Sequence, residues 1–401
     1  MSAQVSLPHR VGVYLGVVQF LFAMTWIVYV IYLPQLAAKA GIPKQWILPI
    51  LMLDQAIFAV MDCAMGMAAD RMARIAGRVS RAVLAVTLAS CAAFLLMPIA
   101  APAGGAGALV VLIVLWSVTS SALRAPPLVL LAKYAPPASQ PWLASLSLLG
   151  LGVAGAAAPY VGMMLAGLDP RIPFAIASLA LGAATLGMLW AEKTLAHAEK
   201  AGASSSAGFS FDALAVAFLA AVLLLALGIQ IHVALGSVPQ YLRFAKATEL
   251  AHLLPMFWVG FNLAMLPAGF AAQRYGAVPL MAAAGIAGAG ALFAAAQAGG
   301  LPSLVAFQLL AGGAWACVLA GAVGAALSIG RAGREGLVAG GVFALIALAT
   351  FTRMAFVYFE LNKSADFTSA LAVAPTAAWL VAGVLLIVVT TTVRKKQGYR
   401  P

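Results

Sequence analysis

The chain has 401 residues, of which 64% are hydrophobic and only 8% are charged. A soluble domain of this size needs a charged surface, so the composition excludes one and indicates a protein dissolved in lipid. The net charge of +12 would suit nucleic acid, but the basic residues lie between apolar segments, and we expect no nucleic-acid partner. Three cysteines show neither metal-site nor disulfide spacing.

Twelve apolar segments follow one another, and each has about the 20 residues that a helix needs to cross the hydrocarbon core. They run over residues 11–34, 46–68, 80–100, 106–131, 142–166, 171–191, 211–238, 250–272, 277–298, 301–329, 336–359 and 367–392. We therefore predict an all-α membrane protein with twelve transmembrane helices.

The basic residues predict the orientation of these helices. When the segments alternate in direction, 15 of the 23 Lys and Arg residues fall on the side of the N-terminus and 6 on the opposite side. By the positive-inside rule, both termini are then cytoplasmic. The first segment is too long for a signal-peptide core and eleven more follow, so we expect no cleaved signal. The Ala and Gly bias suggests a bacterial inner membrane.

One long polar interruption, 194–210, contains Gly202 and three consecutive serines. It has the composition of a flexible linker. We expect it to join an N-terminal six-helix bundle, residues 1–193, to a C-terminal six-helix bundle, residues 211–401, on the cytoplasmic side.

The two halves share a sequence repeat. Leu33-Pro-Gln, Ile47-Leu-Pro and Gly66-Met-Ala-Ala-Asp70-Arg71 recur as Val238-Pro-Gln, Leu253-Leu-Pro and Gly269-Phe-Ala-Ala-Gln273-Arg274. The offsets are 205, 206 and 203 residues, about half the chain. Many secondary transporters are built from two repeated bundles that rock around a central site.

The stretch from Gly66 through Asp70 and Arg71 to Arg74 resembles the signature loop between helices 2 and 3 of the major facilitator superfamily. Ala73 stands where that family usually has Gly, and Gln273 replaces the acid in the second copy. The resemblance implies two pseudo-symmetric six-helix bundles, a monomer, and a loop that locks the bundles together on the cytoplasmic side. Gly66 permits close approach of a helix, while Asp70 pairs with Arg71 or Arg74 and meets a helix N-terminus. Alternatively, Arg71, Arg74, Arg78 and Arg81 only determine the orientation of the helices in the membrane.

Four charged residues stand out within the predicted spans: Asp54, Asp62, Arg124 and Arg353. Charges are costly there and should face a partner or a cavity. The resemblance places helix 2 beside helices 4 and 11, so we predict an Asp62–Arg124 pair and an Asp54–Arg353 pair that closes the outer gate. A buried carboxylate that loses its basic partner binds a proton more readily, which is a route to proton coupling. The alternative is two static pairs that set helix packing.

In the resembled family, helices 1, 4, 7 and 10 line the substrate cavity. Their polar and aromatic residues here include Gln19, Trp26, Tyr29, Trp116, Ser120, Gln230, His232, Gln308 and Trp315. Aromatic walls with few charges suit a small, partly aromatic or weakly charged solute, and Arg124 could orient a monocarboxylate. We expect an organic solute and protons as partners, with the lipid bilayer as surroundings.

Two other functions within the superfamily remain open. His252 and Met256 are one turn apart, which suits a soft metal, and this spacing is similar to that of a copper-importing branch related to riboflavin transporters. The matching methionine pair on helix 7 is missing here. Residues 150–162 are partly similar to the Gly and Pro motif of drug antiporters. We find no nucleophile–base set, phosphate loop or metal triad, so we expect neither an enzyme nor a cofactor.

Overall fold

The computed structural model describes residues 6–75, 77–198, 213–330 and 333–396. These residues contain eleven apolar helical stretches long enough to cross a membrane, and one of them, Arg78–Tyr134, has 57 residues. That stretch breaks at Gly105, whose positive φ of 66° favours a residue without a Cβ. Dividing it there gives the twelve predicted spans, with the break between the predicted segments 80–100 and 106–131.

The helices of the first half are α1 (Ser6–Lys39), α2 (Ile47–Ala73), α3 (Arg78–Ser120), α4 (Pro126–Tyr134), α5 (Gln140–Leu165), α6 (Arg171–Leu186) and α7 (Met188–Ala198). Those of the second half are α8 (Ala213–Ile231), α9 (Ser237–Leu242), α10 (Leu250–Leu253), α11 (Pro255–Tyr275), α12 (Ala277–Ala296), α13 (Leu301–Ile329), α14 (Glu335–Tyr358) and α15 (Ala365–Lys396). A π-helical turn, His232–Gly236, joins α8 to α9. Short 3₁₀ turns cover Lys44–Trp46, Ser121–Leu123, Ala247–Glu249 and Leu361–Lys363.

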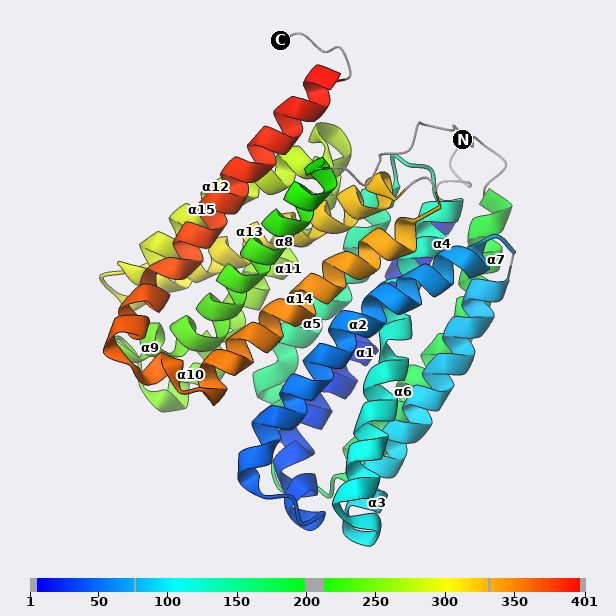
Figure 1. The fold of residues 1–401 in the computed structure, drawn as a ribbon, viewed down its shortest axis with the longest axis vertical. Helices are drawn as coiled ribbons and strands as arrows, with labels where there is room; N and C mark the ends of the chain where they lie inside the picture. Colours follow the sequence, from blue (N-terminus) through cyan, green and yellow to red (C-terminus); the bar gives the residue numbers. More distant parts are fainter. Residues whose placement is uncertain (1–5, 76, 199–212, 331–332, 397–401) are drawn as a thin grey trace.

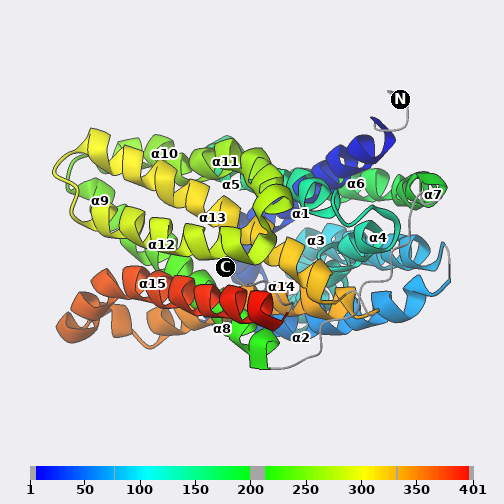
Figure 2. The ribbon, with the colours of Figure 1, turned by 90° about the horizontal axis from the view of Figure 1, so that it is seen from above.

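The helices form two bundles that stand side by side (Figures 1 and 2). The bundles meet along two helix pairs, α2 with α14 and α5 with α11. These pairs correspond under the repeat, because α2 and α11 carry its two copies. We call the end at which α1 begins and α15 ends the terminal face, and the opposite end the distal face.

The repeat is visible in local structure as well as in sequence. In each copy a 3₁₀ turn precedes the helix that carries the motif: Lys44–Trp46 before α2, and Ala247–Glu249 before α10 and α11. In each copy a glycine with positive φ also starts the next helix, Gly77 at 76° and Gly276 at 95°. The two halves therefore share backbone turns as well as helix order.

The expected linker begins later than predicted. Helix α7 continues through Ala198, so the first five residues of the predicted segment 194–210 are helical. The remaining part, like residues 211–212, lies outside the described residues.

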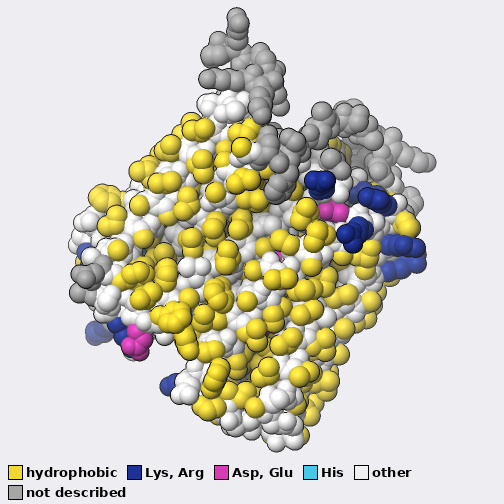
Figure 3. Space-filling view, in the orientation of Figure 1, with side chains coloured by type: hydrophobic (Ala, Val, Ile, Leu, Met, Phe, Trp, Pro, Cys, Tyr) yellow, Lys and Arg dark blue, Asp and Glu magenta, His cyan; other side chains and the backbone are white. Residues whose placement is uncertain are grey.

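The surface has the charge distribution of a membrane protein. Hydrophobic side chains cover the middle of the view in Figure 3, and a group of basic side chains lies near the terminal face. Four exposed arginines at the end of α2 and the start of α3 belong to this face: Arg71, Arg74, Arg78 and Arg81.

Candidate substrate cavity

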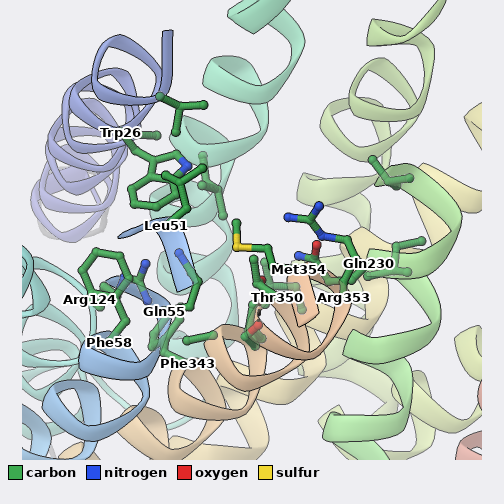
Figure 4. Close-up of a pocket in the computed structure, with 18 of the residues that line it drawn as sticks. Trp26, Leu51, Gln55, Phe58, Arg124, Gln230, Phe343, Thr350, Arg353 and Met354 are labelled. Atoms are coloured by element: carbon green, nitrogen blue, oxygen red, sulfur yellow. Dashed lines mark hydrogen bonds between the residues drawn. The ribbon is translucent and has the colours of Figure 1, made fainter. Parts of the chain in front are cut away.

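A cavity of about 580 Å³ lies between the two bundles. Its wall comes from α1, α2, α3 with the break that follows it, and α5 on one side, and from α8 with its π-helical turn, α11, α13 and α14 on the other. Figure 4 shows side chains from both bundles facing one another across this space. The cavity is thus an interface site to which both halves contribute.

Aromatic rings form the wall contributed by the first bundle. Trp26 of α1 stacks on Trp116 of α3 with ring centres 6.0 Å apart and planes 14° apart. Phe58 of α2 meets Trp26 edge-on at 5.7 Å. All three rings line the cavity. Interlocked rings of this kind make a rigid apolar wall.

Arg124 reaches the cavity from a break in the helix. The α-helix ends at Ser120, a 3₁₀ turn follows, and α4 starts at Pro126 because consecutive prolines cannot continue the preceding helix. The amide of Gln19 holds this break by donating to the Leu123 carbonyl. The Arg124 side chain therefore projects between α2 and the cavity.

The predicted Asp62–Arg124 ion pair is present. Arg124 Nη1 lies 2.8 Å from Asp62 Oδ2, and the Asp62 side chain is fully buried while that of Arg124 is 20% exposed. The guanidinium also lies over Phe58, 4.3 Å from the ring centre. Asp62 therefore neutralises Arg124, and the aromatic wall covers one face of it.

The predicted Asp54–Arg353 pair is absent from this structure, since no ion pair joins the two residues among the described ones. The Asp54 carboxylate is fully buried and accepts hydrogen bonds of 2.7 Å from Tyr29 and from Ser117. It points into the first bundle, where two hydroxyl groups satisfy it, whereas Arg353 faces the cavity from α14. Asp54 itself is not among the cavity-lining residues.

Arg353 is the second cation of the cavity. It is half-buried, and its Nε atom is buried without a hydrogen-bond partner among the described residues. Figure 4 shows it beside Gln230, across the cavity from Arg124. The wall of the cavity thus contains two arginines and no acidic side chain.

Five of the nine residues predicted to bind substrate line the cavity: Gln19, Trp26, Trp116, Gln230 and Trp315. The other four are buried behind its wall: Tyr29, Ser120, His232 and Gln308. His232 lies 2.9 Å from the Gln308 side-chain oxygen, and the Gln308 amide reaches Gln240 at 3.1 Å. This network joins α13 to the α8–α9 turn inside the second bundle.

The signature loop lies at the terminal face, where the bundles touch. Asp70 accepts hydrogen bonds from the backbone N–H groups of Gly336 and Leu337, at 2.6 and 2.9 Å. These residues form the first turn of α14, so the predicted contact with a helix N-terminus across the interface is present. Gly66 packs directly against the Gly336 backbone. Within the part of the chain that the structure describes, no ion pair joins Asp70 to Arg71 or Arg74, which was the other predicted contact. Both arginine side chains are exposed.

The candidate metal residues lie apart from the cavity. His252 is exposed in α10, and its ring lies 5.7 Å from that of Tyr160 in α5. Met256, half-buried at the start of α11, is not part of the cavity wall either. A soft-metal site at these residues remains a prediction.

Sequence reasoning missed most of the wall contributed by α2, α5, α11 and α14. The missed residues include Leu51, Gln55, Leu151, Phe257, Trp258, Phe343, Thr350 and Met354. Gln55 carried a usable signal, since it is an amide within a span and neighbours Asp54. Most of the others are apolar, and in a lipid-soluble sequence such residues look alike whether they face lipid or a cavity.

Known structures share this arrangement. No protein-family model and no curated protein matches the sequence. The human organic anion transporter MFSD10 (TETRAN) superposes with a TM-score of 0.69 at 13% identity, covering 96% of this chain and 100% of that one. The chain has the fold of the major facilitator superfamily.

Two further structures extend this likeness. A bacterial homologue of the iron transporter ferroportin, in an outward-facing state, gives a TM-score of 0.68 at 14% identity over 95% of this chain and 99% of its own. The fucose:proton symporter FucP of E. coli gives 0.62 at 13% identity over 94% and 98%. These likenesses span nearly the whole chain, so the major facilitator fold accounts for both bundles.

Proposed function

We propose that this protein is a secondary transporter that moves a small organic solute across a membrane by alternating access, coupled to protons. The single observation that carries the proposal is the cavity between the bundles, to which each bundle contributes four wall segments. A site at such an interface changes its exposure when the bundles rock. One chain completes the cavity, so we propose that a monomer is the working unit.

The contacts at the terminal face support alternation. There α2 and α14 touch through Gly66 and Gly336, and Asp70 joins them. Toward the distal face, Leu48 and Leu51 of α2 and Met354 of α14 line the cavity instead. The arrangement fits a state closed at the terminal face, like the outward-facing neighbour, with the termini in the cytoplasm of a bacterial cell.

Alternation is tested by measuring distances at both faces. Spin labels replace Arg71 and Arg334, exposed at the terminal face, and in a second variant Trp46 and Phe359, exposed at the distal face. The native cysteines are first replaced by alanine. We expect two distance populations for each pair in double electron–electron resonance, with the terminal distance lengthening as the distal one shortens between pH 8 and pH 5. A single unchanged distance at both faces would remove the proposal.

Proton coupling is proposed to reside in Asp54 and Asp62. Both carboxylates are fully buried, and only Asp62 has an arginine partner among the described residues. Growth profiling of a deletion strain across nutrients and toxicants identifies a solute for uptake or efflux assays. We then expect Asp54→Asn or Asp62→Asn to abolish the response of transport to an imposed proton gradient. Unaltered pH dependence in both variants would contradict coupling but leave transport intact.

A further inference from the structure

The cavity contains one uncompensated positive charge. Its charged wall residues are Arg124 and Arg353, and Asp62 neutralises the first at 2.8 Å. Arg353 makes no hydrogen bond or ion pair to any described residue, and its Nε atom is buried. Its neighbours in the wall, Gln230, Thr350 and Met354, are uncharged, and no ion pair among the described residues includes Arg353.

An unpaired cation at membrane depth is costly, and such groups normally face a charged partner or mark a substrate path. The guanidinium presents a planar fork of donors that matches the two oxygens of a carboxylate. Nothing in the described protein occupies that fork. The geometry therefore favours an anionic group on the solute.

The remainder of the wall defines the rest of the solute. Trp26, Trp116, Trp258 and Trp315 supply aromatic surface on both sides, while Gln19, Gln55 and Gln230 supply neutral amides. A volume of about 580 Å³ holds an organic molecule of moderate size. One free cation suits one negative charge, and the absence of acidic groups in this wall disfavours a cationic solute.

We propose that the cavity binds an organic monoanion with an aromatic or apolar body, and that Arg353 holds its acidic group. This rests on the proposed function, because it names the class of solute that the transporter carries. It goes beyond the sequence-based expectation, in which Arg353 closed a gate and Arg124 oriented the solute.

The test uses three probes of nearly equal shape on the purified full chain in detergent. These are 1-naphthoate, its neutral amide 1-naphthamide and the cationic 1-naphthylmethylammonium, with binding followed by calorimetry. We expect naphthoate to bind at least tenfold more tightly than the other two. We expect Arg353→Gln to lower naphthoate affinity at least tenfold without changing that of the amide, and Arg353→Lys to retain part of it.

Lys363→Gln is the matched control. It removes the same charge at the distal face from a side chain that is 65% exposed and outside the cavity, so naphthoate affinity should not change. A melting curve checks that Arg353→Gln is folded, and we expect no loss of stability because an unpaired buried charge is removed.

Three outcomes overturn the proposal: the amide or the amine binds as tightly as naphthoate, Arg353→Gln keeps wild-type affinity, or none of the probes binds at 10 mM. Binding in detergent is independent of transport. If the anion binds but the spin-label distances never change, the transporter proposal fails alone. If the distances alternate but the anion does not bind, only the solute class fails.

Discussion

Asp54 and Asp62 are both fully buried carboxylates on α2, yet their surroundings differ. Asp62 has a guanidinium partner, while Asp54 has two hydroxyl donors, Tyr29 and Ser117. Hydrogen bonds to an ionised group are about twice as strong as those between neutral groups. The Asp54 donors should therefore contribute measurably to stability.

Replacing one of these donors gives a stability prediction. Ser117→Ala removes the 2.7 Å hydrogen bond to Asp54 and leaves a buried carboxylate oxygen unpaired. We expect the free energy of unfolding to fall by about 2 kcal/mol, measured by reversible unfolding in mixed detergent.

Ser178→Ala is the control, because Ser178 is similarly buried but its hydroxyl has no hydrogen-bond partner among the described residues. It should change the free energy of unfolding by less than about 0.5 kcal/mol. Equal losses in the two variants would show that the bond to Asp54 contributes nothing specific.

At the same scale, the structure contains one of the two charge pairs that the sequence predicted. Asp62 and Arg124 were matched by depth, on two helices that the resemblance to the major facilitator superfamily places side by side within one bundle. Asp54 and Arg353 were matched by depth across the interface, but depth does not determine the direction in which a side chain points. Hydroxyl groups from Tyr29 and Ser117 compete for a carboxylate, and their direction depends on helix rotation.

At the scale of the helices, the contact between α2 and α14 depends on missing side chains. Gly66 faces the Gly336 backbone, and Gly340 faces the backbone of Asp62. Without hydrophobic drive between helices in lipid, such close backbone approach supplies the van der Waals contact. The role of Gly66 was predicted from sequence. Its partners on α14 were not, because nothing in the sequence distinguishes Gly336 and Gly340 from the other glycines among the chain's 38.

Gly66→Ala should weaken this contact. The added methyl group would overlap the Gly336 carbonyl, so the helices must separate at the terminal face. Overpacking costs about 1–3 kcal/mol, enough to shift a two-state population roughly tenfold. We expect the spin-label pair at 71 and 334 to populate its longer distance in this variant.

Gly341→Ala provides the control on α14, because a methyl group there would meet no atom within 4 Å. Its distance distribution should match that of the wild type. If Gly66→Ala also leaves the distribution unchanged, close packing at Gly66 does not hold the terminal face closed.

At the scale of the whole molecule, sequence predicted the twelve spans, the break near Gly105 and the repeat. Apolar segments and recurring motifs can be recognised in the sequence without a structure. Sequence did not indicate which face is closed. If the proposed alternation holds, its two states are built from the same chain and differ little in free energy, so no local pattern favours one of them.

Orientation in the membrane is the remaining whole-molecule prediction. The exposed arginines of the terminal face, among them Arg71 and Arg74, should lie in the cytoplasm, because translocating clustered positive charge is disfavoured.

In a cysteine-free background, Ile75→Cys reports the terminal face and Trp46→Cys the distal face. These side chains are 47% and 54% exposed, so their thiols should react at similar rates when reagent reaches them. With a membrane-impermeant maleimide, we expect labelling of Trp46→Cys in intact cells and of Ile75→Cys only after permeabilisation. The reverse pattern would place the terminal face outside and contradict the predicted orientation, whereas labelling of neither after permeabilisation would contradict the exposure on which the test depends.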